Sequence, residues 1–317
     1  MEEIQDKINK KRKLRPSTLK TYVFNLDKLH RKMFDKPIET ISFLKNTDDV
    51  MKELSSLKQS TQKTYLASIV VALDAIGGQD TALEKYRELM IKNIKDHDKE
   101  IIEQQKSPTQ AKNWTTMKNL KKINSNYFNE IKRRDILNKS DKTSKDKELL
   151  QKWLVSSLYV IDNKNPPLRN DYSPMEIVKL GEYNKLTEKE KNDSNYLVIQ
   201  SRNNKFFSLG EYKTSGSYGL KKIPIGKQLN TVINKYLLAV GNQKYLLTNN
   251  KNEAMSSNGL TKFIIKTFEP SGKKISANIL RHIYISEYLT GPSLKDKLDL
   301  ADKMGHNTNT QEKYKKT

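Results

Sequence analysis

The sequence predicts a mainly α-helical protein of two domains, with one small antiparallel sheet in the second domain. Apolar residues recur at helical spacing through most of the chain. Three short segments, 195–200, 205–213 and 220–225, have the composition of strands instead. The stretch QQKSPTQAKNW separates the two halves and has the composition of a linker. We therefore expect a helical domain over residues 1–105 and a second domain over 106–317.

The first domain opens with the basic stretch NKKRKLRP, which ends at Pro16. This stretch is either a solvated terminus or nuclear-import signal, or a flexible arm that clamps DNA phosphates. Two amphipathic helices follow, the first with Ser17 as its expected N-cap and the second running from Ser60 to Gly77. A third helix is expected over 82–104. The basic residues of the arm are Lys10, Lys11, Arg12, Lys13 and Arg15.

The first two helices begin alike, with STLKTY at 17–22 and STQKTY at 60–65. Shared capping chemistry explains the similarity without any function. Alternatively, both helix N-termini face DNA, so that their free amide groups and Lys20 or Lys63 pair with phosphates. Both explanations stay open from the sequence, and these helices are the candidates for the major groove.

In the second domain, two helices over about 115–137 and 145–162 precede the three strands. The stretch TSGSYG separates the last two strands and has the composition of a hairpin turn. Further helices are predicted over about 227–240, 258–267, 277–289 and 294–304.

The charge of the chain favours a polyanionic partner. Lys and Arg number 59 against 37 Asp and Glu, which gives a net charge of +22, and mean hydropathy is −0.80. Neutralising phosphates releases condensed counterions, so a chain of this charge binds nucleic acid readily. No run of about 18 apolar residues and no signal peptide is present, which favours nucleic acid over a membrane.

Several kinds of chemistry are excluded by residue type. The absence of cysteine removes disulfides, thiolate nucleophiles and cysteine–zinc sites, and it is typical of an intracellular protein. The four histidines, at positions 30, 97, 282 and 306, lack metal-ligand spacing, and no phosphate-binding loop occurs. We therefore expect no metal, no cofactor and no nucleotide hydrolysis. The abundance of Asn and Lys points to an AT-rich genome, which concerns the source and not the chemistry.

Five residues stand at suggestive places in the second domain. Arg169 follows two prolines, and Lys213 ends a predicted strand before the hairpin turn. Arg281 lies in the first turns of a helix expected to be capped by Ser276, and His306 follows Gly305 at a helix end. Tyr314 lies close to the last residue. Each of these taken singly is more simply a solvated or structural side chain.

The order of these motifs resembles that of the tyrosine recombinases, the phage-integrase-like family. The motifs are an arginine, a hairpin lysine, LRH, GH and a tyrosine. The resemblance covers the whole chain in architecture, and its motifs concentrate in residues 276–314. It implies an N-terminal core-binding domain and a catalytic domain that clamp duplex DNA between them. The Asn- and Lys-rich, cysteine-free style is similar to that of integrases of large DNA viruses, which would place the protein in the nucleus or cytoplasm of a host cell.

The resemblance implies a role for each residue. Tyr314 would be the nucleophile, and Arg169 and Arg281 would hold the scissile phosphate. Lys213 would protonate the departing 5′ oxygen, and His306 would hydrogen-bond a non-bridging oxygen. Two guanidinium groups can stabilise the charge of phosphodiester cleavage without a metal, and they favour ionisation of a phenol whose pKa is ordinarily about 10.

The sequence departs from the family pattern at three points. Asn278 stands where the family usually has histidine, three residues before Arg281, and an amide cannot shuttle a proton. His282 is a neighbour that could share that role. On a helix, however, its side chain points about 100° away from that of Arg281. Tyr314 follows His306 by eight residues, one fewer than is usual. Only three residues follow Tyr314, where many relatives have a helix that docks on a neighbouring subunit. The polar segment between His306 and Tyr314 is expected to be a mobile tether.

The expected function is therefore site-specific recombination or integration of double-stranded DNA through a 3′-phosphotyrosine, without metal or ATP. Two duplexes would be joined by a homotetramer, with the free protein a monomer. A type IB topoisomerase and a decayed recombinase that only binds DNA are the alternatives, and a metal-dependent transposase is the least favoured. Neither the DNA target nor the direction of reaction follows from the sequence.

Overall fold

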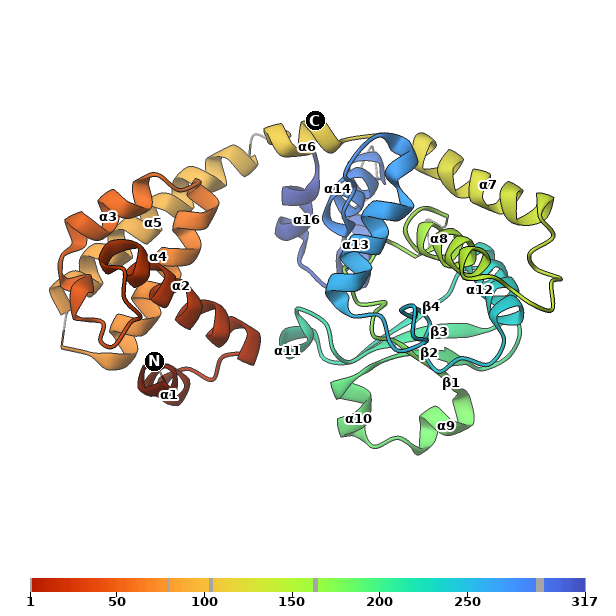
Figure 1. The fold of residues 1–317 in the computed structure, drawn as a ribbon, viewed down its shortest axis with the longest axis horizontal. Helices are drawn as coiled ribbons and strands as arrows, with labels where there is room; N and C mark the ends of the chain where they lie inside the picture. Colours follow the sequence, from red (N-terminus) through yellow and green to blue (C-terminus); the bar gives the residue numbers. More distant parts are fainter. Residues whose placement is uncertain (1, 79, 103–104, 162–164, 289–293, 317) are drawn as a thin grey trace. The chain divides into compact units, whose positions relative to one another are not determined.

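The computed structural model describes residues 2–78, 80–102, 105–161, 165–288 and 294–316. The chain divides into two compact units, Met1–Glu103 and Gln104–Thr317 (Figure 1). Each has a hydrophobic core of its own. Among the described residues, no helix is both long and apolar enough to cross a bilayer.

The first unit is a helical bundle built around one apolar helix. Its elements are α1 (Glu2–Lys11), α2 (Pro16–Phe34), the 3-10 turn η1 (Ser42–Lys45), α3 (Thr47–Ser55), α4 (Gln59–Ile76) and α5 (Asp80–Ile102). Helix α4 is in contact with α1, α2, α3 and α5. It carries buried residues on most of its circumference, including Ile69 and Ala72, because neighbours surround it. The unit is thus organised about α4.

The basic stretch that ends at Pro16 begins inside a helix, so its first residues do not form a flexible arm, and its contact with DNA stays a prediction. Residues 2–11 form helix α1, whose Ile4 and Ile8 lie one helical turn apart and are buried in the core of the first unit. The side chains of Lys11 and Arg12 form ion pairs with Asp74 of α4, with nitrogen–oxygen distances of 3.4 and 3.0 Å. Apolar anchoring and these ion pairs attach the segment to the bundle.

The expected N-cap of the first of the next two helices and the expected start of the second also differ. Helix α2 begins at Pro16 with Arg15 as its N-cap, and α4 begins at Gln59 with Lys58 as its N-cap. Neither cap residue makes a side-chain capping hydrogen bond. Proline suits the first helical turn because its φ angle is already helical and its missing N–H would be unpaired there. Ser17 and Ser60 therefore lie inside the first turns.

The second unit contains a four-stranded sheet between two helical layers. Its strands are β1 (Glu176–Lys179), β2 (Asn195–Ile199), β3 (Lys205–Leu209) and β4 (Lys221–Pro224), in that spatial order. Strands β2, β3 and β4 pair antiparallel, with Leu197 opposite Phe207 and Phe207 opposite Ile223. Strand β1 pairs parallel to β2. The sheet is therefore mixed, and the prediction of a purely antiparallel sheet missed β1.

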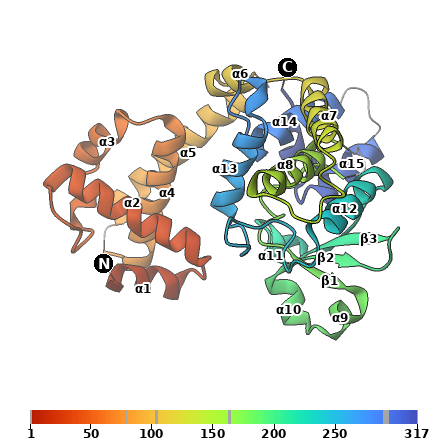
Figure 2. The ribbon, with the colours of Figure 1, turned by 45° about the vertical axis from the view of Figure 1, so that its right-hand side comes forward.

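Both faces of the sheet are covered (Figures 1 and 2). On one face, Tyr196 and Val198 pack with Tyr183 of a short helix. On the other, Leu197 and Phe207 join the main core of the unit. Alternate residues of a strand point to opposite faces, which explains why β2 is apolar almost throughout. The helices of this unit are α6 (Pro108–Asn113), α7 (Met117–Arg133), α8 (Ser144–Val160), α9 (Leu180–Lys185), α10 (Glu188–Asp193), α11 (Ser215–Tyr218), α12 (Lys227–Val240), α13 (Ser257–Thr267), α14 (Ala277–Tyr288), α15 (Leu294–Lys303) and α16 (Thr308–Tyr314), with the 3-10 turn η2 (Glu269–Ser271).

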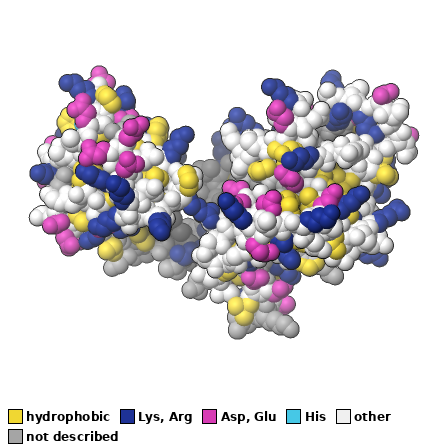
Figure 3. Space-filling view, turned by 90° about the horizontal axis from the view of Figure 1, so that it is seen from below, with side chains coloured by type: hydrophobic (Ala, Val, Ile, Leu, Met, Phe, Trp, Pro, Cys, Tyr) yellow, Lys and Arg dark blue, Asp and Glu magenta, His cyan; other side chains and the backbone are white. Residues whose placement is uncertain are grey.

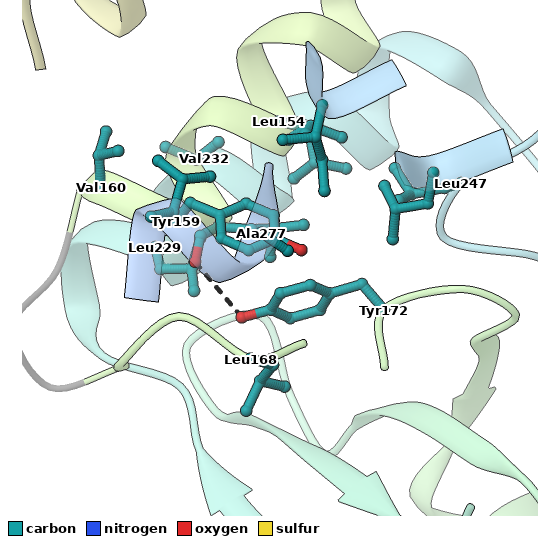
Figure 4. Packing of buried hydrophobic residues seen from close by; sticks show 14 of the residues in the cluster. Leu154, Tyr159, Val160, Leu168, Tyr172, Leu229, Val232, Leu247 and Ala277 are labelled. Carbon is teal, nitrogen blue, oxygen red and sulfur yellow. Dashed lines mark hydrogen bonds between the residues drawn. The ribbon is translucent and has the colours of Figure 1, made fainter. Parts of the chain in front are cut away.

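The main core joins the long helices to the segment that follows α8 (Figure 4). Tyr172 is buried against the ring of Tyr159, and its hydroxyl donates a hydrogen bond of 3.3 Å to the carbonyl oxygen of Leu158. Leu168 is also buried in this core. These contacts attach residues 165–172, an irregular segment, to a rigid helix.

Two further expectations differ from the structure in the second unit. Strand β3 ends at Leu209, so Lys213 lies in the connection between β3 and β4, and TSGSYG contains the short helix α11 in place of a tight turn. The segment after His306 is helix α16, capped by the Asn307 side chain, which accepts a hydrogen bond of 2.7 Å from the amide of Thr310. The tether predicted there is wrong because Gln311 and Tyr314 pack inward.

Candidate active site

Arg281 is the centre of the candidate site and lies inside the protein. It is 1% exposed, on α14, where Ile279, Leu280 and Ile283 hold the helix in the core. Its Nη1 donates to the carbonyl oxygen of Pro167 (2.8 Å), and its Nη2 lies 3.4 Å from Nδ1 of His306. Its Nε atom has no partner among the described residues.

No ion pair between described residues involves Arg281. A buried cation without a carboxylate partner is costly, because it has lost its hydration without gaining a counter-ion. Burial accordingly lowers the pKa of Arg281 from its ordinary value, although the guanidinium stays protonated at neutral pH. The charges of Tyr314 and Asp171 offset this burial only in part, so an anion bound beside Arg281 would be stabilised.

His306 is held beside Arg281 by a glycine turn. Gly305 lies in the turn after α15 and has a φ of +66°, a conformation that glycine adopts readily. A Cβ at Gly305 would lie 3.2 Å from Oγ1 of Thr214 and 3.3 Å from the ring of Tyr212, so a side chain would crowd this turn. The close approach of the β3–β4 connection thus also favours glycine at this position.

The hydrogen-bond partners of His306 assign its proton. A guanidinium only donates, so Nδ1 of His306 accepts from Arg281 and the proton of the neutral ring is on Nε2. The Nε2 atom is buried and has no partner among the described residues. His306 therefore presents a free N–H donor beside the buried arginine, which suits an anionic oxygen.

Burial, together with the charges of Arg281, Arg169 and Lys221, lowers the pKa of His306 to about 3. An unfolded histidine has a pKa of about 6.5, so between these values the unfolded chain binds a proton that the folded chain does not. The contribution of the neutral His306 ring to the free energy of unfolding is therefore complete above about pH 6.5 and is lost as the pH falls towards about 3.

We expect the free energy of unfolding of the wild type to fall by about 2 kcal/mol more between pH 7 and pH 5 than that of His306→Gln, because glutamine does not titrate. Urea unfolding of both proteins at several pH values measures the difference. Parallel pH profiles would contradict the assignment of a buried neutral imidazole.

Tyr314 ends α16 and lies among these groups. Its ring centroid is 5.0 Å from Cζ of Arg281 and 5.4 Å from the ring centroid of His306. Burial raises the pKa of Tyr314, but the charges of Arg281 and Arg169 and their hydrogen bonds to the phenol lower it by more, so the net shift is downward. The surroundings therefore favour the phenolate, which is the nucleophilic form.

Arg169 reaches the same point from the segment after α8. The hydroxyl of Tyr159 donates a hydrogen bond of 2.8 Å to the backbone carbonyl oxygen of Arg169. Next to it, Leu168 is buried in the main core. These contacts fix the backbone from which the Arg169 side chain extends to the phenol of Tyr314. Four of the residues proposed from the sequence therefore meet in one place: Arg169, Arg281, His306 and Tyr314.

Lys213 lies next to a residue that contacts this group, but its own side chain is exposed. Its neighbour Thr214 donates a hydrogen bond of 2.8 Å to the carbonyl oxygen of Gly305. This bond fixes the β3–β4 connection to the turn that carries His306. No hydrogen bond or ion pair between described residues involves the Lys213 amino group.

Another lysine, which the sequence reasoning missed, acts on the site. Lys221 begins β4, and its amino group is 2.8 Å from Oδ1 of Asp302. Its charge is among those that lower the pKa of His306. The proximity of a strand lysine to the end of α15 has no local sequence signal.

The other predicted residues are placed as follows. Asn278 is on α14 and exposed, and it makes no side-chain hydrogen bond to another described residue. In the first unit, Lys63 is half-buried, and the remaining predicted DNA contacts are exposed: Lys10, Lys11, Arg12, Lys13, Arg15 and Lys20. Figure 3 shows Lys and Arg side chains spread over the viewed faces of both units, with Asp and Glu among them.

His282 is a second residue whose contact the sequence did not predict. Its ring lies 4.8 Å from that of Tyr314, and its Nδ1 is 2.8 Å from the Tyr314 carbonyl oxygen. Although His282 and Arg281 point in different directions from α14, both can contact Tyr314 because α16 lies alongside α14 (Figure 1). The only available signal was its position next to Arg281. Within the described part of the chain, no group of three or more His, Asp or Glu residues could hold a metal ion.

Comparison with known proteins adds a structural likeness. No protein-family model matches the chain, and no curated protein matches it. Among solved structures, the crystal structure of XerA recombinase aligns with 99% of this chain and 94% of that chain, at 12% sequence identity and a TM-score of 0.39.

Proposed function

We propose that this chain is a DNA strand transferase that cuts and rejoins duplex DNA through a phosphotyrosine intermediate, and that it acts in site-specific recombination. One observation carries the proposal. The phenol of Tyr314 is hydrogen-bonded by both Arg169 and Arg281, beside a buried His306 whose Nε2–H has no partner among the described residues. This set supplies a nucleophile and cationic and neutral donors for one phosphate.

In the proposed cleavage step, the phenol oxygen attacks the phosphorus and the bond from phosphorus to the 5′ oxygen breaks. The phenol loses its proton, and the departing 5′ oxygen gains one. The two guanidinium groups and the Nε2–H of His306 hydrogen-bond the non-bridging oxygens, whose negative charge increases in the transition state. The DNA 3′ end is left attached to Tyr314 as a phosphodiester.

Rejoining is the reverse of this step. A 5′-hydroxyl attacks the phosphotyrosine, and the phenolate departs, so the number of phosphodiester bonds is conserved and no external energy source is needed. When the attacking hydroxyl belongs to another duplex, the result is strand exchange. Exchange of both strands of two duplexes breaks four phosphodiester bonds, and each chain supplies one nucleophilic tyrosine. We therefore propose that four copies of the chain assemble on the two duplexes.

Lys213 remains our proposal for the group that protonates the departing oxygen. It lies in the connection that Thr214 attaches to Gly305, next to His306. Its side chain is exposed, and no hydrogen bond or ion pair with a described residue engages its amino group. Lys221 is less suited, because its amino group is engaged with Asp302.

The decisive experiment is covalent capture in the presence of EDTA. Nicked duplexes of random sequence are incubated with the protein, and the mixture is separated under denaturing conditions. After cleavage, the short fragment that carries the new 5′-hydroxyl dissociates at the nick, so that the adduct cannot be rejoined. We expect a protein–DNA adduct that survives EDTA, and sequencing of the attached DNA would identify the target. Binding without any adduct would contradict the proposal, whereas adducts at all sequences with plasmid relaxation would indicate a type IB topoisomerase.

A further inference from the structure

His282 contacts the backbone of the proposed nucleophile. It follows Arg281 on α14 and is 8% exposed. Its Nδ1 is 2.8 Å from the carbonyl oxygen of Tyr314, and the two rings are tilted by 41° at a centroid distance of 4.8 Å. Because a carbonyl oxygen only accepts, Nδ1 carries the proton and donates it.

The end of a short helix explains why this bond matters. Helix α16 has seven residues and ends at Tyr314, and the last carbonyl groups of a helix have no partner within it. A helix of this length is marginal by itself and depends on contacts with the rest of the protein. The imidazole of His282 satisfies one of these carbonyl groups, at the residue whose side chain would react.

A second bond acts one turn further along α14. The backbone amide of Lys316 donates a hydrogen bond of 2.8 Å to Oγ of Ser286. Residues four apart on a helix share a face, so His282 and Ser286 form two neighbouring attachments for the chain at and after Tyr314. The helix that carries Arg281 therefore also holds the backbone of the proposed nucleophile.

We propose that His282 is a positioning residue for DNA cleavage: its Nδ1–H and its ring hold Tyr314 so that the phenol oxygen faces the phosphate bound by the arginines. This inference rests on the proposed function. Burial lowers the pKa of His282, so the ring is neutral at pH 7 and adds no charge to the phosphate site. Its contribution is geometric, and errors of about 1 Å in the placement of a reacting group can cost about 100-fold in rate.

Three substitutions separate the hydrogen bond from the packing. His282→Ala removes both, His282→Phe retains a ring without a donor, and His282→Asn retains an N–H near the position of Nδ1. At saturating DNA we expect single-turnover capture to fall by about 10- to 100-fold in the Ala and Phe variants, with unchanged DNA affinity. The Asn variant should recover most of the rate. Wild-type rates in the Ala variant, or no advantage of Asn over Phe, would overturn the proposal.

A second measurement tests how His282 holds the backbone around Tyr314 and does not depend on DNA cleavage. Hydrogen–deuterium exchange of the peptide spanning residues 308–316 in the DNA-free protein should be faster in the Ala and Phe variants and close to wild type in the Asn variant. Equal exchange in all four proteins would overturn the attachment itself. If exchange responds but wild-type protein forms no adduct, the proposed function fails and the catalytic role of His282 falls with it.

Discussion

Replacing Tyr314 with Phe is expected to abolish covalent capture of DNA while leaving DNA affinity unchanged. The substitution removes only the phenol oxygen, and the aromatic ring keeps its contacts with Arg281 and His282. Without that oxygen no covalent bond to phosphorus can form, so the loss should exceed about 1,000-fold, as it does for other essential nucleophiles. Capture on nicked duplexes in EDTA measures the rate, and a gel-shift titration measures the affinity.

Tyr218→Phe is the matched control. Tyr218 is also a phenol in the second unit, but its side chain is 39% exposed and lies at the end of α11. It should capture DNA at the wild-type rate. Adducts formed by Tyr314→Phe would show that another residue is the nucleophile, and peptide mapping of the adduct would identify it.

Arg281→Ala and Arg169→Ala are each expected to slow capture by about 100-fold or more. Each removes a charge-assisted hydrogen-bond donor to the phosphate, and loss of one such donor in an enzyme site costs about 100- to 1,000-fold. Arg281→Lys retains the charge but not the planar fork, so it should recover only part of the rate. Single-turnover capture at saturating DNA measures these effects.

The same variants should change the pH dependence of capture. The charges of Arg281 and Arg169 lower the pKa of Tyr314, and removing either charge lets burial raise it again. Because the phenolate fraction rises with pH, the wild-type rate should level off below pH 10, and the rise in the variants should lie at higher pH. An unchanged profile would contradict the proposed contact with the phenol.

Arg133→Ala provides the control for general loss of positive charge. Arg133 is exposed at the end of α7 and pairs with Glu130, so its removal should leave capture at the wild-type rate. Thermal melting of each variant is needed because Arg281 is buried and bonded to Pro167. A folded Arg281→Ala protein with the wild-type capture rate would remove Arg281 from the site.

Local patterns predicted the regular elements well where apolar spacing is long and helix caps are clear. The helices at α8 and α12 were expected within one or two residues of their bounds, because Thr143 caps the first and Gly241 ends the second. Strand β1 was missed because four residues, EIVK, give too short a pattern, and its pairing with β2 joins segments separated by α9 and α10. The fold class was confirmed, with a mixed sheet in place of an antiparallel one.

Charge-rich segments were the least predictable. The basic stretch that ends at Pro16 was interpreted from its lysines and arginines, whereas its first residues belong to α1, whose two isoleucines enter the core. The polar segment before Tyr314 was likewise interpreted as a tether. Its packing against α14 and α15 makes it a helix, and those partners lie elsewhere in the chain.

By itself, the sequence determined which residue types are present, their order along the chain and the absence of cysteine chemistry, because these are properties of composition and spacing. Only the tertiary structure decided that Arg169 and Arg281 meet at Tyr314, that His306 is neutral with its proton on Nε2, and that His282 holds the backbone of Tyr314. The physical reason is that burial and charge–charge distances depend on contacts between residues that lie from 25 to 145 positions apart in the chain.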